Sequence, residues 1–147
     1  MEHGFGGLFM MRILIVFVFI YVVFIGIALN IAKTYRIKNG VINILEHSMV
    51  KDVEKDTTVF GEDGYLRKYF SKIPYTITEE DIEDDCDARA GTNLHNHSTG
   101  ACVVKVKMEN SQEYYYKVYV YMVIHFKLFG IDNWKVPVSG ETVTMPE

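Results

Sequence analysis

An uninterrupted apolar run of twenty residues, Ile13 to Ala32, constrains this chain more than any other feature. The run carries no charge, and Asn30 is its only strongly polar member. Twenty residues in an α-helix span about 30 Å, the thickness of the hydrocarbon core of a bilayer. A lone segment in lipid must satisfy its own backbone hydrogen bonds, so a helix is expected although Val, Ile and Phe favour strands in water. The sequence therefore predicts a transmembrane helix over residues 13–32, with membrane-anchoring side chains at Ile13, Phe17, Tyr21, Phe24 and Leu29.

The average composition hides a division between two environments. The chain has 147 residues, is 49% hydrophobic and carries a net charge of −4, and nearly every charge lies at Lys33 or beyond. No basic stripe or nucleic-acid motif is present, which argues against nucleic-acid binding. We expect a short leader over 1–12, the transmembrane helix over 13–32, an amphipathic continuation over 33–50 and an extracytoplasmic α+β domain over 51–147.

Two questions about the membrane segment stay open in the sequence. Gly26-Ile27-Ala28 resembles a signal-peptidase site, but the apolar run continues to Ala32, which favours a retained anchor over a cleaved signal peptide. Arg12 precedes the segment, whereas Lys33, Arg36 and Lys38 follow it, so the positive-inside rule favours a cytoplasmic carboxyl domain. The cysteines favour the opposite orientation, with the carboxyl domain outside the cytoplasm.

After the membrane segment, apolar residues recur at helical spacing. These residues follow one another at steps of three and four and form one apolar stripe: Tyr35, Ile37, Val41, Ile44, Leu45 and Met49. The stripe predicts a single helix from about Leu8 to Val50, and the second half of this helix needs a partner surface. A second helical pattern covers residues 64–73 and ends before Pro74. Residues 75–78 are predicted as a short edge strand. Residues 79–87 hold seven acidic side chains in nine, and together with the turn-forming residues up to Gly100 they are predicted as an exposed loop.

The remainder of the chain alternates with the period of β-strands. We predict strands over 101–108 and 114–129, a turn over 130–133, and an edge strand over 134–139 that contains Pro137 and that Gly140 bends before residues 141–145. One face of the 114–129 strand is wholly apolar or aromatic, and the other is mixed and predicted to be half-exposed. The expected fold is therefore α+β, with the long first helix packed on a small antiparallel β-meander.

Two cysteines, Cys86 and Cys102, flank the turn-rich segment. A disulfide between them would close this segment and would require an oxidising compartment, and the alternative is two unrelated reduced thiols. His95 and His97 lie between the cysteines, so the four residues have the ligand types of a zinc site without its usual spacing. On that spacing we predict no metal site and no cofactor.

Four acidic residues alternate along the chain like the start of an EF-hand loop: Asp81, Glu83, Asp85 and Asp87. The glycine and the glutamate that complete such a loop are replaced by Cys86 and Thr92, so a solvated acidic loop is the stronger interpretation. No hydrolase, nucleotide-binding or metalloprotease motif is present, and we predict that the chain is not an enzyme. A lone histidine such as His125 is more often structural than catalytic. Tyr115, Tyr119 and Tyr121 form a row that is either an interaction surface or covered by the second helix.

The order of these segments resembles pilins and pseudopilins, above all the small TadE-like pseudopilins. The resemblance rests on GFGGLFMMRILIVFVF at the start, NIAKTYRIKNGVINILEH after the membrane segment and VPVSGET near the end. Prepilin peptidase substrates have glutamate five residues after the glycine of the cut. The fifth residues after Gly4, Gly6 and Gly7 are Phe9, Met11 and Arg12, so the resemblance implies an uncleaved minor component.

The resemblance implies a single-pass, pilin-like structural component of a Tad or type IV-like pilus or secretion assembly. Its partners would be the lipid bilayer and other pilin-like subunits or secretion-assembly proteins. The alternative is a membrane-anchored extracytoplasmic binding module that uses the acidic loop or the tyrosine-rich strand. Genes for a secretion ATPase or a prepilin peptidase beside this one would favour the first.

Overall fold

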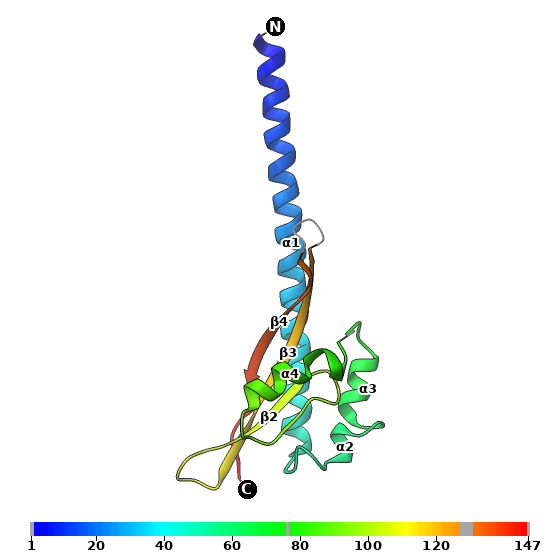
Figure 1. Cartoon of the computed structure of the whole chain (residues 1–147), viewed down its shortest axis with the longest axis vertical. Helices are drawn as coiled ribbons and strands as arrows, with labels where there is room; N and C mark the ends of the chain where they lie inside the picture. Colours follow the sequence, from blue (N-terminus) through cyan, green and yellow to red (C-terminus); the bar gives the residue numbers. More distant parts are fainter. Residues whose placement is uncertain (1, 76, 127–130, 147) are drawn as a thin grey trace. The chain divides into compact units, whose positions relative to one another are not determined.

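The computed structural model describes residues 2–75, 77–126 and 131–146, without the side chains of residues 2–5, 124–126 and 131–133. The described residues form four helices: α1 (Glu2–Ser48), α2 (Thr57–Phe60), α3 (Tyr65–Ser71) and α4 (Glu79–Ala90). Five strands follow them: β1 (His95–Asn96), β2 (Cys102–Lys107), β3 (Glu113–Phe126), β4 (Ile131–Glu141) and β5 (Met145–Pro146) (Figure 1). The fold class is α+β, as predicted. The chain divides between Lys33 and Thr34 into two compact units, which we describe separately.

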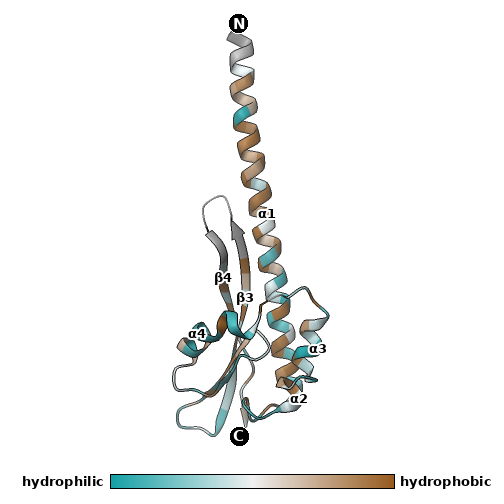
Figure 2. Cartoon of the chain, turned by 45° about the vertical axis from the view of Figure 1, so that its right-hand side comes forward, coloured by the Kyte–Doolittle hydropathy of each residue, from teal (hydrophilic) through white to brown (hydrophobic). Residues whose placement is uncertain are grey.

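The first unit is the part of α1 that precedes Thr34. Within the described residues one helix is long and apolar enough to cross a membrane, and its most apolar stretch has a mean hydropathy of 2.9 with no residue buried in the chain. Figure 2 shows apolar residues along this part of α1. The helix begins at Glu2, so the expected leader is also helical, and the predicted first helix is confirmed with an earlier start.

The sheet of the second unit is an antiparallel meander in the order β1-β2-β3-β4, and β5 pairs with the beginning of β3. The strands predicted over 101–108 and 114–129 are confirmed as β2 and β3, and residues 127–129 lie outside the described part. The predicted turn is wrong at Ile131–Asn133, because these residues already belong to β4, in which Ile131 pairs with Phe126. Gly130 lies outside the described residues. Pro137 lies in β4, which pairs with β3 only and is the edge strand that the proline predicts.

The C-terminal part of α1 covers one face of this sheet. Its buried residues Ile37, Val41 and Leu45 lie in one apolar cluster with the alternate side chains of β3 that were predicted to face the core, from Tyr114 to Val120. Val59, Phe60, Leu66 and Phe70 of α2 and α3 join this cluster. Gly40 permits close packing here, because a Cβ atom on it would overlap the hydroxyl and ring of Tyr69. The predicted packing of the amphipathic helix on the meander is confirmed.

Side chains of the sheet satisfy the backbone where the chain leaves α1. The hydroxyls of Tyr114 and Tyr116 both donate to the carbonyl of Val50, at 2.8 and 2.6 Å. The Lys105 ammonium donates to the carbonyl of Lys51 at 2.8 Å. A buried carbonyl without a partner is costly, so these bonds fix where the chain turns away from the helix.

The other face of the sheet is covered by α4, and the exposed loop predicted for this segment is wrong over 79–90. Ile82, Cys86 and Ala90 lie at steps of four on α4 and pack against the second face. Thr78 and Asp81 form a capping box at the start of α4, and three acidic residues in its first turn suit the positive end of the helix dipole. The short strand predicted over 75–78 is also wrong at its described residues, because they form no strand. The sheet is therefore a middle layer between two helical layers.

Candidate functional site

The membrane-anchoring side chains predicted from the sequence all lie on the exposed surface of α1. Ile13 is 37% exposed, and Phe17, Tyr21, Phe24 and Leu29 are each 66–68% exposed. Exposed apolar side chains surround this stretch of the helix. Such a surface requires lipid or other apolar helices as its surroundings.

A disulfide joins Cys86 of α4 to Cys102 of β2, as the sequence predicted. Its Cα atoms are 5.5 Å apart, and both residues are fully buried. The bond ties the last turns of α4 to the middle of the sheet. It also excludes the zinc set of two cysteines and two histidines, because disulfide sulfur atoms carry no thiolate for a metal.

The tyrosine row is not a free surface. Tyr119 is 8% and Tyr121 is 4% exposed, whereas Tyr115 is half-buried. The Tyr121 hydroxyl donates to Asp85 of α4 at 2.5 Å, and the guanidinium of Arg89 lies 5.2 Å from the centre of the Tyr119 ring. The cover is α4, which the sequence assigned to a loop, so neither predicted role of the row holds for Tyr119 and Tyr121.

Asp85 lies at the centre of the polar contacts between α4 and the sheet. It accepts hydrogen bonds from Tyr121 and, at 2.8 Å, from Arg89. Burial by itself raises the pKa of the Asp85 carboxyl, but the two hydrogen bonds and the charge of Arg89 outweigh it and hold the pKa below its ordinary value. Burial and the neighbouring Asp85 raise the pKa of Tyr121, so its hydroxyl remains a donor.

Replacing Tyr121 by Phe tests this contact. We expect Tyr121→Phe to lower the free energy of unfolding by about 1.5 kcal/mol at pH 7. This value is the lower end of the range for hydrogen bonds to charged groups, because water reaches Asp85. A lowered carboxyl pKa stabilises the fold above the unfolded-state pKa, and that contribution disappears as the pH falls through the folded-state pKa. The deficit of the variant should therefore shrink in acid.

Denaturant unfolding of the detergent-solubilised chain at pH 7 and below about pH 3 measures both effects. Tyr115→Phe is the matched control, because the Tyr115 hydroxyl has no hydrogen bond within the described part of the chain and the variant should unfold like the parent. A Tyr121→Phe deficit that is equal at both pH values would disprove the role of the Asp85 charge.

The EF-hand-like loop considered for the acidic segment is wrong, because its carboxylates lie on a helix and not in a loop. Asp81 accepts from the backbone and side chain of Thr78, and these bonds hold its pKa below the ordinary value. Asp85 binds Tyr121 and Arg89, Asp87 faces His95, and Glu83 is exposed. These carboxylates therefore serve different partners and do not converge on one ion.

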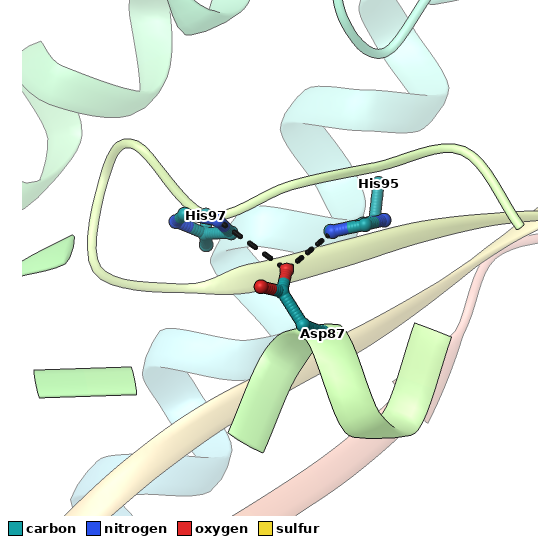
Figure 3. Close-up of side chains that lie close together, drawn as sticks. All are labelled: Asp87, His95 and His97. Carbon is teal, nitrogen blue, oxygen red and sulfur yellow. Dashed lines mark hydrogen bonds and ion pairs between the residues drawn. The ribbon is translucent and has the colours of Figure 1, made fainter. Parts of the chain in front are cut away.

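Asp87, His95 and His97 come together between the last turn of α4 and the β1 edge of the sheet (Figure 3). The Nε2 atom of His95 lies 2.7 Å from Oδ1 of Asp87, and Nε2 of His97 lies 3.7 Å from the same oxygen. The hydrogen bond from Nδ1 to the Asn93 carbonyl is the main cause that raises the pKa of His95; burial opposes it, and Asp87 adds to it. Sequence reasoning named both histidines as candidate ligands but assigned Asp87 to a different site.

The remaining candidate, His125, lies in β3, and its side chain is outside the described part of the structure.

Two clefts open on the second unit. One of about 770 Å³ is lined by the end of α1, α2 and α3, and includes His47 and Lys68. The other, of about 730 Å³, borders Glu79 and Thr99. Neither contains a recognisable catalytic arrangement among its lining residues.

Searches against protein-family models, curated proteins and solved structures each find no match.

Proposed function

We propose that the chain is a single-pass, membrane-anchored structural subunit, pilin-like in architecture, of a Tad or type IV-like pilus or secretion assembly. One observation carries the proposal. The same helix, α1, exposes an uncharged, apolar surface from Ile13 to Ala32 and buries one stripe against an antiparallel sheet from Thr34 onward. The resemblance of the terminal and juxtamembrane segments to TadE-like pseudopilins agrees with this arrangement.

The proposed mechanism is packing. From Ile13 to Ala32, α1 presents apolar side chains on all sides, so it can exchange lipid for the matching helices of neighbouring subunits at little hydrophobic cost. The buried Cys86–Cys102 disulfide supports an oxidising compartment, and therefore an extracytoplasmic sheet domain. Because no acidic residue stands five positions after Gly4, Gly6 or Gly7, we propose an uncleaved minor component and not the major filament subunit.

Deletion of the gene and complementation in the parent cell test the proposal. We expect the deletion strain to lose surface filaments or secretion, and the wild-type gene to restore them. Val22→Arg should fail to restore them, because a central arginine costs about 2.5–3.5 kcal/mol of membrane insertion. Val143→Arg is the matched control, because Val143 is 63% exposed and Val22 is 61% exposed. Val143 lies on the sheet domain and not in the membrane segment, so this variant should restore filaments or secretion.

The same strains separate the alternative function. Normal filaments and normal secretion in the deletion strain would contradict a structural subunit. The anchored binding module would then be favoured, with the outward residues of α4, Glu80, Glu83 and Asp84, as its remaining acidic surface.

A further inference from the structure

The cluster of Asp87, His95 and His97 has the layout of a metal site as well as its ligand types. His95 and His97 are two residues apart in extended chain, so both imidazoles point to the same side, toward α4 (Figure 3). Asp87 points back from the last turn of α4, and its Oδ1 atom lies between the two Nε2 atoms. One ligand atom from each of the three residues lies within 4.8 Å of the others.

The second nitrogen of each imidazole also has a suitable neighbour. Nδ1 of His95 lies 3.0 Å from the carbonyl oxygen of Asn93, which can accept a hydrogen bond from it. Nδ1 of His97 is buried and makes no hydrogen bond in the described part of the chain, but Oε1 of Glu79 lies 3.3 Å away. Metal-binding histidines commonly use a backbone carbonyl and a carboxylate in this way, which leaves Nε2 free to bind the ion.

The disulfide fixes the two sides of the cluster. Cys86 precedes Asp87 directly, and its partner Cys102 begins β2. Strand β2 pairs with β1, with His95 opposite Val104. Asp87 is therefore held in place by the neighbouring disulfide, and His95 by the pairing of β1 with β2. Little movement of the three side chains is needed to bind an ion.

We infer that Asp87, His95 and His97 bind one divalent transition-metal ion of the zinc class and clamp the end of α4 to the edge of the sheet. Imidazole nitrogen and carboxylate oxygen are ordinary ligands of zinc, at about 2.0–2.2 Å. Tetrahedral binding places ligand atoms about 3.3 Å apart; here the two Nε2 atoms lie 2.7 and 3.7 Å from Oδ1 of Asp87, and the ligand atoms of the two histidines lie within 4.8 Å of each other. Three protein ligands leave one position for water. This inference does not depend on the proposed assembly role.

Zinc titration of the full chain in detergent tests the inference. The protein is purified without a histidine tag, kept oxidised, freed of metal with a chelator, and titrated with zinc chloride in competition with a chromophoric chelator. We expect one zinc per chain. His95→Ala, His97→Ala and Asp87→Asn should each weaken binding by at least about tenfold, because even loss of an outer-shell partner commonly costs 10–100-fold. Cobalt substituted for zinc should give the visible absorption of a low-coordinate site.

His47→Ala is the matched control, because His47 is an exposed histidine at the end of α1 that bonds only its own helix at Asn43. It should bind zinc like the parent. Far-ultraviolet circular dichroism and a non-reducing gel establish that each variant is folded and oxidised, and His97→Gln replaces His97→Ala if the latter does not fold. Absence of binding, binding unchanged in the three site variants, or binding that appears only after reduction of the cysteines would overturn the inference.

Discussion

Leu45→Ala should lower the free energy of unfolding of the sheet domain by about 3 kcal/mol, the largest effect of any single truncation that we propose. Leu45 is fully buried in the apolar cluster that α1 forms with β3, α2 and α3. Removing its side chain loses the transfer free energy of the buried carbons and leaves a cavity between layers that are fixed by neighbouring helices. Denaturant unfolding of the full chain in detergent, followed by the near-ultraviolet circular dichroism of the buried tyrosines, measures the change.

Leu29→Ala provides the matched control for this prediction. The substitution removes the same atoms from the same helix, but Leu29 is 66% exposed and lies in the unit that precedes Thr34. The sheet domain should therefore unfold as in the parent. Equal losses from the two variants, or no loss from Leu45→Ala, would refute the assignment of Leu45 to the domain core.

Removing the disulfide should cost a similar amount. In the Cys86→Ala/Cys102→Ala double variant we expect a loss of about 3 kcal/mol, the chain-entropy value for a closed loop of this length. The cysteines are 16 residues apart, and the bond joins a helix to a sheet that otherwise touch through a small apolar cluster and through polar contacts such as that of Asp85 with Tyr121. Replacing both cysteines together avoids leaving a buried free thiol.

Reduction separates the covalent bond from the packing of the two side chains. A reductant should lower the stability of the parent toward that of the double variant and leave the double variant unchanged. Mass spectrometry of membrane-extracted protein should show both thiols blocked to alkylation until reductant is added. Alkylation of both without reduction would contradict the bond and, with it, the oxidising compartment.

The parts of the fold that were predictable are those with a long single-period pattern. The stripe from Ile37 to Leu45 and the alternation from Tyr114 to Val120 each identify an element and its buried face, and each needs the other as cover. Helix α4 was missed because seven acidic residues outweighed two weaker signals. These were the Thr78–Asp81 capping box and the stripe of Ile82, Cys86 and Ala90, whose two small members add little hydrophobic signal.

The candidate site shows the same limit. The disulfide was predictable because two cysteines in a chain with a membrane anchor leave one pairing. The cluster of Asp87, His95 and His97 was not, because its geometry depends on α4 being a helix and on β1 folding back beside β2. Both conditions are tertiary, and the two-residue strand β1 carries no pattern of its own.

The two ends of the meander have a consequence for association between chains. A sheet edge with unpaired backbone groups invites strand addition by another copy, which leads to uncontrolled aggregation. Here the two-residue β1 pairs with Val103 and Val104 of β2 at one edge, and the other edge is β4, whose Pro137 lacks an N–H group to donate. Pro137 therefore interrupts strand addition by another copy along β4, and the two-residue β1 offers little backbone for it.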